Sequence, residues 1–248
     1  SSDVCSSDLQ KAFGYTYEDF KTSILPMALN GSEQIGAMGI DTPLAVLSNN
    51  HQPLFNYFKQ LFAQVTNPPI DSIREKVVTS TTVYLGSDGN VLEEKPENCK
   101  QLRINNPILT NTDILKIKNM KVDGFKVETI PIIYYKNTSL EKAIDHLYVE
   151  ADRAHREGAN IIILSDRGVD ENHVAIPSLL AVSALQQYLV QTKKRTSMAV
   201  ILESGEPRDV HHFATLLGFG ASAINPYLAQ ESIQELIDLN MLDKDYYA

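Results

Sequence analysis

The sequence has few cysteines, no long apolar run and no excess of basic residues, and each absence excludes a class of protein. Its two cysteines, Cys5 and Cys99, are too few for a disulfide framework or an Fe–S site. No apolar run approaches the ~20 residues that a transmembrane helix needs. The 31 Asp and Glu residues outnumber the 22 Lys and Arg residues, which argues against sequence-independent nucleic-acid binding. We therefore expect a cytoplasmic protein without a membrane or nucleic-acid partner.

The length and composition are those of a globular protein. The chain has 248 residues, of which 43% are apolar and 21% are charged, so it can bury a sizeable core. This length suits one or two domains, and also a single (β/α)8 barrel, which runs to about 250 residues.

The first nine residues, SSDVCSSDL, differ from the rest of the chain because they are rich in Ser and Asp and have no periodicity. They lack the basic and apolar regions of a signal peptide. They look like a translated sequencing adaptor, so we expect residues 1–9 to be a non-native tail that replaces the true N-terminus. A disordered native tail is the alternative. The domain itself is expected to span residues 10–248.

Residues 10–124 are predicted to be rich in loops and helices. Three glycines and a proline make residues 31–43 a loop. A helix is predicted to begin at Pro53 and to end at Asn67-Pro68-Pro69, because two prolines forbid further helix. Its apolar stripe, expected in the core, consists of Phe55, Phe58, Leu61, Phe62 and Val65. Residues 77–85 and 90–94 resemble two strands around a turn at residues 87–89, and Cys99 follows in an exposed stretch as an incidental surface cysteine.

Residues 125–240 alternate strands and helices. Strands are predicted near residues 130, 162, 200 and 224, and each is followed by a helix. Thr138 and Glu141 form a candidate capping box for the first helix, and Asp209 is a candidate cap for the third. The last helix is predicted over residues 230–239. Repeated βα units predict a parallel sheet, either doubly wound or a barrel. The expected fold is α/β, a partial or degenerate (β/α) TIM-barrel-like domain with a loop-rich N-terminal half.

Polar residues follow the carboxyl ends of these strands, where sites of parallel sheets gather. Asp166, Glu203 and one of His211 and His212 could together bind a divalent metal. The more favoured interpretation is structural, with Asp166–Arg167 and Glu206–Arg208 as local ion pairs and the histidines in the core or at the helix terminus. No phosphate-binding or nucleophile-elbow motif is present.

Several long strings carry a resemblance to a known family. They are KAFGYTYEDF, GAMGIDTPLAVLS, LFNYFKQLFAQVTNPPIDSIRE, ILSDRG, AIPSLLAV and ESGEPRDVHHFATLLGFGASAINPYLA. Through them the chain resembles the central domain of the glutamate synthase large subunit from Lys11 to about Glu231. Ala37 stands where the family usually has serine, and residues 186–188 replace a histidine-rich run.

The resemblance implies a part of an oxidoreductase that makes L-glutamate from 2-oxoglutarate and glutamine. The implied partners are an amidotransferase domain and an FMN synthase domain of the same chain, with a small subunit or ferredoxin as electron donor. FMN and an Fe–S cluster are implied for the full-length enzyme and no cofactor for these residues, so the fragment alone should be inactive.

The resemblance further implies that this domain forms wall of an intramolecular ammonia tunnel. The positions that match are Met38 in GAMG and Thr66 in QVTNPP, with Asn67 and Ile70 as weaker neighbours. No catalytic or metal-binding residue is expected. Two other functions stay open: a free-standing metal-dependent barrel hydrolase that uses Asp166, Glu203 and His211, and a free-standing scaffold or interaction module.

Overall fold

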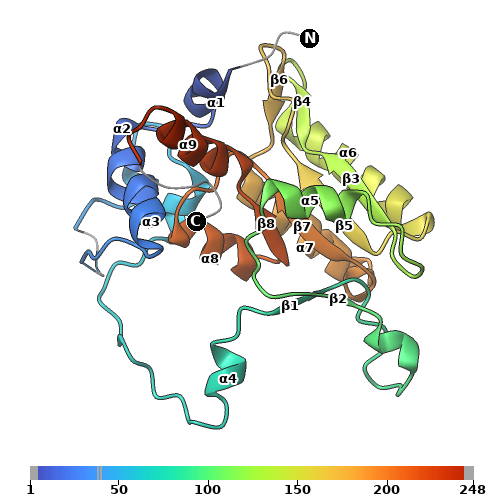
Figure 1. The fold of residues 1–248 in the computed structure, drawn as a ribbon. Coiled ribbons are helices and arrows are strands. Elements are labelled where there is room, and N and C mark those ends of the chain that lie inside the picture. The colour runs from blue at the N-terminus through green and yellow to red at the C-terminus, as the bar shows by residue number, and fades with distance from the viewer. Residues whose placement is uncertain (1–4, 38, 40, 243–248) are drawn as a thin grey trace.

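A parallel sheet of four strands forms the centre of the molecule (Figure 1). The computed structural model describes residues 5–37, 39 and 41–242. The sheet order is β3-β5-β7-β8, so the strands lie in chain order. Their bounds are β3 (Val127–Pro131), β5 (Ile161–Ser165), β7 (Ala199–Glu203) and β8 (Ala223–Asn225). Strands β5 and β7 are buried at every position, as their continuous apolar runs predict for strands covered on both faces.

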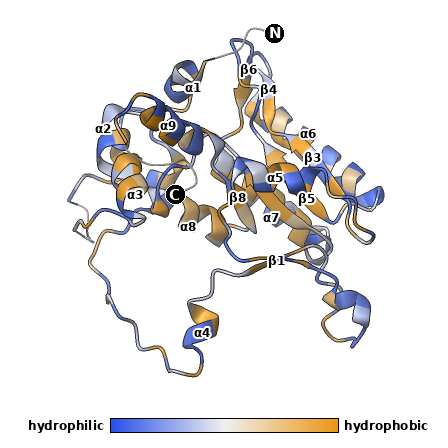
Figure 2. Cartoon of the chain, in the orientation of Figure 1, coloured by the Kyte–Doolittle hydropathy of each residue, from blue (hydrophilic) through white to orange (hydrophobic). Residues whose placement is uncertain are grey.

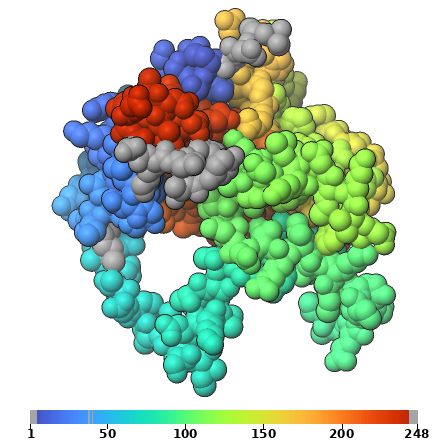
Figure 3. Space-filling view, in the orientation of Figure 1, coloured from blue at the N-terminus to red at the C-terminus, as the bar shows by residue number. Residues whose placement is uncertain are grey.

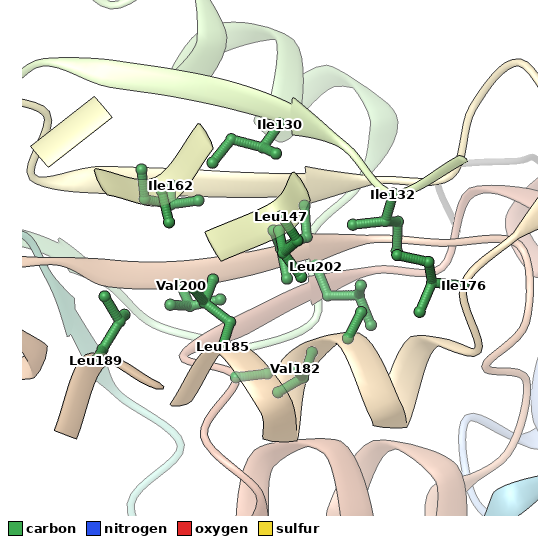
Figure 4. Close-up of a cluster of buried hydrophobic side chains, with 14 of the residues drawn as sticks. Ile130, Ile132, Leu147, Ile162, Ile176, Val182, Leu185, Leu189, Val200 and Leu202 are labelled. Atoms are coloured by element: carbon green, nitrogen blue, oxygen red, sulfur yellow. The ribbon is translucent and has the colours of Figure 1, made fainter. Parts of the chain in front are cut away.

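One face of the sheet carries the three helices that follow β3, β5 and β7. These are α6 (Leu140–Arg156), α7 (Ser178–Gln191) and α8 (Val210–Gly218). Leu147 of α6, Leu185 of α7 and Leu216 of α8 share one apolar cluster with Leu164 and Leu202 of the sheet, part of which Figure 4 shows. The helices therefore lie side by side on the same face, as their apolar stripes require.

The opposite face is covered by α5 (Asn111–Lys118) and by a two-stranded antiparallel sheet of β1 (Val83–Leu85) and β2 (Leu102–Ile104). Ile114 and Ile117 of α5 pack with Ile161 and Ile163 of β5. The hairpin predicted between residues 77–85 and 90–94 is wrong, since β1 pairs with the more distant β2. The 3-10 helix η4 (Pro96–Cys99) lies in the intervening excursion.

The N-terminal helices pack beside the last helix, α9 (Tyr227–Asp238). They are α1 (Ser6–Ala12), α2 (Tyr17–Asp19), the π-helix η1 (Phe20–Ile24) and α3 (Leu25–Asn30). Ile24 and Leu236 are buried in one apolar cluster. The side-chain amide of Gln10 donates to the side chains of Ser232 and Glu235. Helix α1 thus begins within residues 1–9, which the sequence predicts to be a non-native tail.

The helix predicted from Pro53 to residue 67 is wrong. Only Leu54–Phe58 is helical, as the 3-10 turn η3, and residues 59–71 contain neither helix nor strand. Phe55 is fully buried, whereas Phe62 is 77% and Val65 is 72% exposed. We call residues 59–78, which end in α4 (Glu75–Val78), the arm. Figure 3 shows it projecting from the body, and Figure 2 shows apolar residues along it as well as in the sheet.

Smaller differences concern element boundaries. The predicted strand over residues 126–135 is divided at Ile132, because β4 (Ile133–Tyr135) leaves the main sheet and pairs with β6 (His173–Ala175). The cap of α6 is Ser139, which accepts from the amide of Lys142, and the predicted capping box at Thr138 is wrong. Helix α9 begins three residues earlier than predicted. The remaining 3-10 helices are η2 (Ala45–Leu47) and η5 (Arg195–Ser197). Within the described ranges, no helix has the length and apolarity to span a membrane.

Candidate functional site

The carboxyl edge of the parallel sheet brings polar residues together, as predicted. Ser165 pairs with Glu203 across β5 and β7, and Glu203 pairs with Asn225 across β7 and β8. The amide of Asp166 donates to the carbonyl oxygen of Glu203 at 3.1 Å. The aligned register of parallel strands therefore places residues 165–166, 203–204 and 225 at one edge.

Asp166 is buried, with 1% of its surface exposed. Its carboxylate accepts from the hydroxyl of Ser204 at 2.5 Å, from the hydroxyl of Tyr227 at 2.7 Å and from the amide of Gly205 at 3.1 Å. Burial raises the pKa of Asp166 to about 7, against the lowering effect of these donors. The Arg167 guanidinium lies 4.0 Å above the ring of Tyr227 and pairs with Glu203. The predicted local ion pair between Asp166 and Arg167 is therefore wrong.

Glu203 is equally buried but is paired with cations. Lys118 Nζ lies 2.8 and 2.9 Å from its two carboxylate oxygens, and Arg167 Nε lies 3.3 Å away. Ser165 also donates its hydroxyl to Glu203. Burial alone would raise the pKa of Glu203, but the hydrogen bonds from Lys118 and Ser165 and the two positive charges lower it. Both carboxylates at this edge are therefore satisfied by protein donors.

The two adjacent histidines contact other groups, on η3 and at Arg208. His211 Nε2 lies 2.8 Å from the carbonyl oxygen of Phe55. The ring of His212 stacks on the ring of Phe55, with centroids 4.3 Å apart and an interplanar angle of 22°. Burial lowers the pKa of His212 to about 4, so the ring is neutral, and its Nδ1 accepts from the amide of Arg208 at 3.2 Å.

The metal-dependent hydrolase is therefore not supported. Asp166, Glu203 and His211 are engaged by three different sets of partners and do not form one ligand set. Among the described residues, no group of three or more His, Cys, Asp or Glu side chains could hold a metal ion. The predicted Glu206–Arg208 ion pair is also wrong, since Arg208 pairs with Asp19 and donates to the backbone carbonyl of Glu206.

The predicted tunnel residues lie in two loops. Met38 falls outside the described residues. Thr66 and Asn67 are exposed on the arm, and Ile70 is 37% exposed. The two loops approach each other closely at Gly39. A Cβ atom at Gly39 would lie 3.3 Å from the carbonyl oxygen of Leu61 and 3.6 Å from the amide nitrogen of Ala63.

A hollow of about 470 Å³ lies beside this approach, between η2 and η3. Its walls include the side chains of Leu44, Tyr57 and Leu61, and Lys59 is the one charged residue among the described residues that line it. Such a lining suits a small uncharged molecule better than an ionised substrate, because it offers neither a carboxylate nor a cluster of cations.

Sequence reasoning missed two groups of residues. The sequence does not point to Lys118, because α5 is short and its periodicity is weak. The contact of α8 with Phe55 joins segments more than 150 residues apart, so no local sequence pattern predicts it.

Comparisons with known proteins identify the family of the chain. The family model of the glutamate synthase central domain matches residues 8–247. The chain is 46% identical over 237 residues to the glutamate synthase [NADPH] large chain of Bacillus subtilis (strain 168), covering 96% of this chain and 16% of that protein. It is 44% identical to the glutamate synthase [NADH] of Schizosaccharomyces pombe, covering 93% of this chain and 11% of that protein.

A ferredoxin-dependent relative shows the same pattern. Ferredoxin-dependent glutamate synthase 2 of Synechocystis is 43% identical over 230 residues, covering 91% of this chain and 15% of that protein. The chain thus spans less than a fifth of the length of these relatives. Because the family model covers nearly all of the chain, the chain belongs to the glutamate synthase central domain family.

Proposed function

We propose that this chain is the part of a glutamate synthase that joins an amidotransferase domain to an FMN synthase domain. The whole protein would make L-glutamate from 2-oxoglutarate and glutamine-derived ammonia, with a small subunit or ferredoxin supplying electrons in the cytoplasm. The match to the central-domain model over residues 8–247 carries this proposal.

The cofactors of such an enzyme would be held outside these residues. An Fe–S cluster needs several cysteine ligands, whereas Cys5 and Cys99 are both exposed and lie in separate parts of the fold. The chain also lacks the glycine-rich phosphate-binding motifs that would indicate an FMN site.

The flanking DNA tests the first part of the proposal. The reading frame should continue upstream into an amidotransferase with a catalytic cysteine and downstream into an FMN-binding barrel. Native start and stop codons directly around residues 10–248 would instead indicate a free-standing module and contradict the proposal.

The second part of the proposal concerns ammonia transfer. We propose that Met38 and the arm around Thr66, Asn67 and Ile70 form wall of the tunnel between the two catalytic domains. The backbone approach of Gly39 to Leu61 and Ala63 supports this, because it ties the two loops together. The sparsely charged hollow beside them suits neutral NH3, which an ionised carboxylate would bind as ammonium.

Tryptophan substitution in the full-length protein tests the tunnel. Thr66→Trp places a large ring in the proposed passage and should lower glutamine-driven glutamate formation relative to glutamine hydrolysis. Glutamate formation from added ammonia should be unaffected. An unchanged ratio of the two activities in both Thr66→Trp and Met38→Trp would contradict the tunnel assignment.

The winding of the sheet favours one of the two predicted architectures. In a doubly wound sheet, crossover helices occupy both faces, whereas in a barrel they all lie outside. Here α6, α7 and α8 share one face and the strands follow chain order. We infer that these βα units correspond to part of a (β/α) barrel wall, with α5 and the β1–β2 pair filling the inner face.

A further inference from the structure

Helix α8 holds the turn from which the arm departs. His211 Nε2 lies 2.8 Å from the carbonyl oxygen of Phe55, the second residue of η3. A carbonyl oxygen can only accept, so the proton of His211 must sit on Nε2 and point at η3. The bond joins the first turn of α8 directly to the backbone of η3.

His212 provides a second attachment to the same residue. Its ring stacks on the Phe55 ring, and both side chains are buried. The ring is itself fixed, because Nδ1 accepts from the amide of Arg208. Asp209 caps α8 by accepting from the amide of His212 at 2.8 Å, which fixes the helix turn that carries both histidines.

The far end of η3 is held by the end of α8. The ring of Phe58 meets the ring of Phe219 edge-on, with centroids 5.0 Å apart and an interplanar angle of 64°. Phe219 directly follows the last residue of α8. Both ends of η3 therefore contact one helix, whose other side packs on the central sheet through Leu216.

The arm begins immediately after this attachment. Lys59 follows Phe58, and Leu61 and Ala63 make the close backbone approach to Gly39. Eight positions separate Phe58 from Thr66 in the sequence. Because the intervening residues form neither helix nor strand, the place where η3 is fixed limits where residues 61–66 can lie.

We propose that His211 and His212 are positioning residues, which act through Phe55 to set the place of the tunnel loops relative to the sheet. This inference rests on the proposed tunnel function, because it assigns to α8 the task of holding that wall in register. Neither histidine touches the transferred ammonia. The pair would explain why two adjacent histidines open this helix although they bind no common ligand.

The test is a set of substitutions in the full-length protein that contains this chain. His211→Leu removes the donor and leaves the Phe55 carbonyl unpaired, whereas His211→Gln keeps an N–H donor of similar reach. His212→Ala removes the stacked ring, whereas His212→Phe keeps it. His146→Ala, on the exposed face of α6, is the matched control.

Three activities are measured for each variant: glutamine hydrolysis, glutamine-driven glutamate formation and glutamate formation from added ammonia. His211→Leu and His212→Ala are expected to lose glutamine-driven glutamate formation relative to the other two activities. The Gln and Phe variants should restore most of that coupling, and His146→Ala should match the parent. Retention of the other two activities would separate positioning from general destabilisation, and rescue by the conservative variants would assign the loss of coupling to the contacts with Phe55.

Two results would overturn the inference. One is an equal loss of all three activities in His211→Leu and His212→Ala, which would indicate a purely structural role. The other is normal coupling in both histidine variants while Thr66→Trp uncouples the enzyme. That result would support the tunnel function but show that α8 does not position its wall. If Thr66→Trp, Met38→Trp and the histidine variants all remain coupled, the tunnel function itself fails.

Discussion

Asp166 and Glu203 leave neighbouring parallel strands side by side, yet their pKa values shift in opposite directions. Both carboxylates are 1% exposed, so burial penalises charge on each. The difference lies in their partners. Glu203 faces Lys118 and Arg167, whereas Asp166 is bonded by uncharged hydroxyl and amide donors. The edge of the sheet thus carries one ionised carboxylate and one that titrates near neutrality.

This difference predicts how stability depends on pH. The pKa of Asp166 is about 7 in the folded chain and ordinarily 3.8, so the folded state binds more protons between these values. Its contribution to stability is complete below pH 4 and is lost as the pH rises to about 7, at no more than about 1.4 kcal/mol per pH unit. Asp166→Asn should remove this slope. Asp170→Asn is the control, because backbone amides lower the pKa of Asp170 from its ordinary 3.8, so its slope has the opposite sign and lies below the measured pH range.

Urea midpoints between pH 5 and pH 7.5 measure the effect for each variant. If the parent chain and Asp166→Asn show the same dependence on pH, the buried Asp166 does not titrate in this range.

A second prediction concerns the ion pair of Lys118 and Glu203. Lys118→Met leaves a buried carboxylate with Arg167 as its remaining cation and should lower the free energy of unfolding at pH 7 by about 1–3 kcal/mol. The pKa of Glu203 should rise, so the loss should shrink as the pH falls. Lys100→Met, which breaks an exposed pair with Asp123, should change stability by less than about 1 kcal/mol. Equal effects of the two substitutions would contradict the burial of Glu203.

A third prediction separates the observed η3 turn from the helix that the sequence favours. Phe55→Ala should cost about 3–5 kcal/mol, because its ring is fully buried beneath α8. Phe62→Ala in the isolated chain should change stability by about 0.5 kcal/mol at most, because its ring is exposed. Thermal or urea unfolding measures both. A helix with a buried stripe would instead make the two substitutions similarly costly.

A fourth prediction uses two glycines of the same loop. A Cβ at Gly39 meets the backbone of Leu61 and Ala63, whereas a Cβ at Gly36 meets nothing within 4 Å. In the full-length protein, Gly39→Val should separate the two loops and reduce the coupling of glutamine hydrolysis to glutamate formation. Gly36→Val should leave coupling close to that of the parent. Comparable coupling in the two variants would show that the close approach of the loops has no part in ammonia transfer.

The βα units could be predicted from sequence because their signals are local. Burial can be predicted within a single element from the continuous apolar run at residues 160–164 and from the apolar stripe between Leu140 and Ala154. Asp209 caps α8 as expected, by a bond to an amide three residues away. The same reasoning placed Asp166 and Glu203 at one edge, since parallel strands align their carboxyl ends.

The errors arose where a distant partner decides the structure. The stripe from Phe55 to Val65 has helical spacing, but a lone helix is marginal unless another surface buries it. Here Phe55 packs on His212 of α8, and Phe58 packs on Phe219, which follows that helix. The loop at Gly39 approaches the backbone at Leu61, and the later apolar side chains Phe62 and Val65 are exposed. Strand β1 likewise pairs with β2 and not with the nearer residues 90–94. The local sequence does not indicate which of these distant segments closes the loop.

The sequence alone determined the alternation of strands and helices, the family and the two loops that we propose as a tunnel wall, because periodicity, capping residues and long matching strings are properties of the chain itself. Tertiary structure alone decided that the crossover helices share one face, that Asp166 and Glu203 differ in charge, and that two histidines hold η3. These outcomes depend on which groups meet across long separations in the chain, where burial, hydrogen bonding and nearby charge act together.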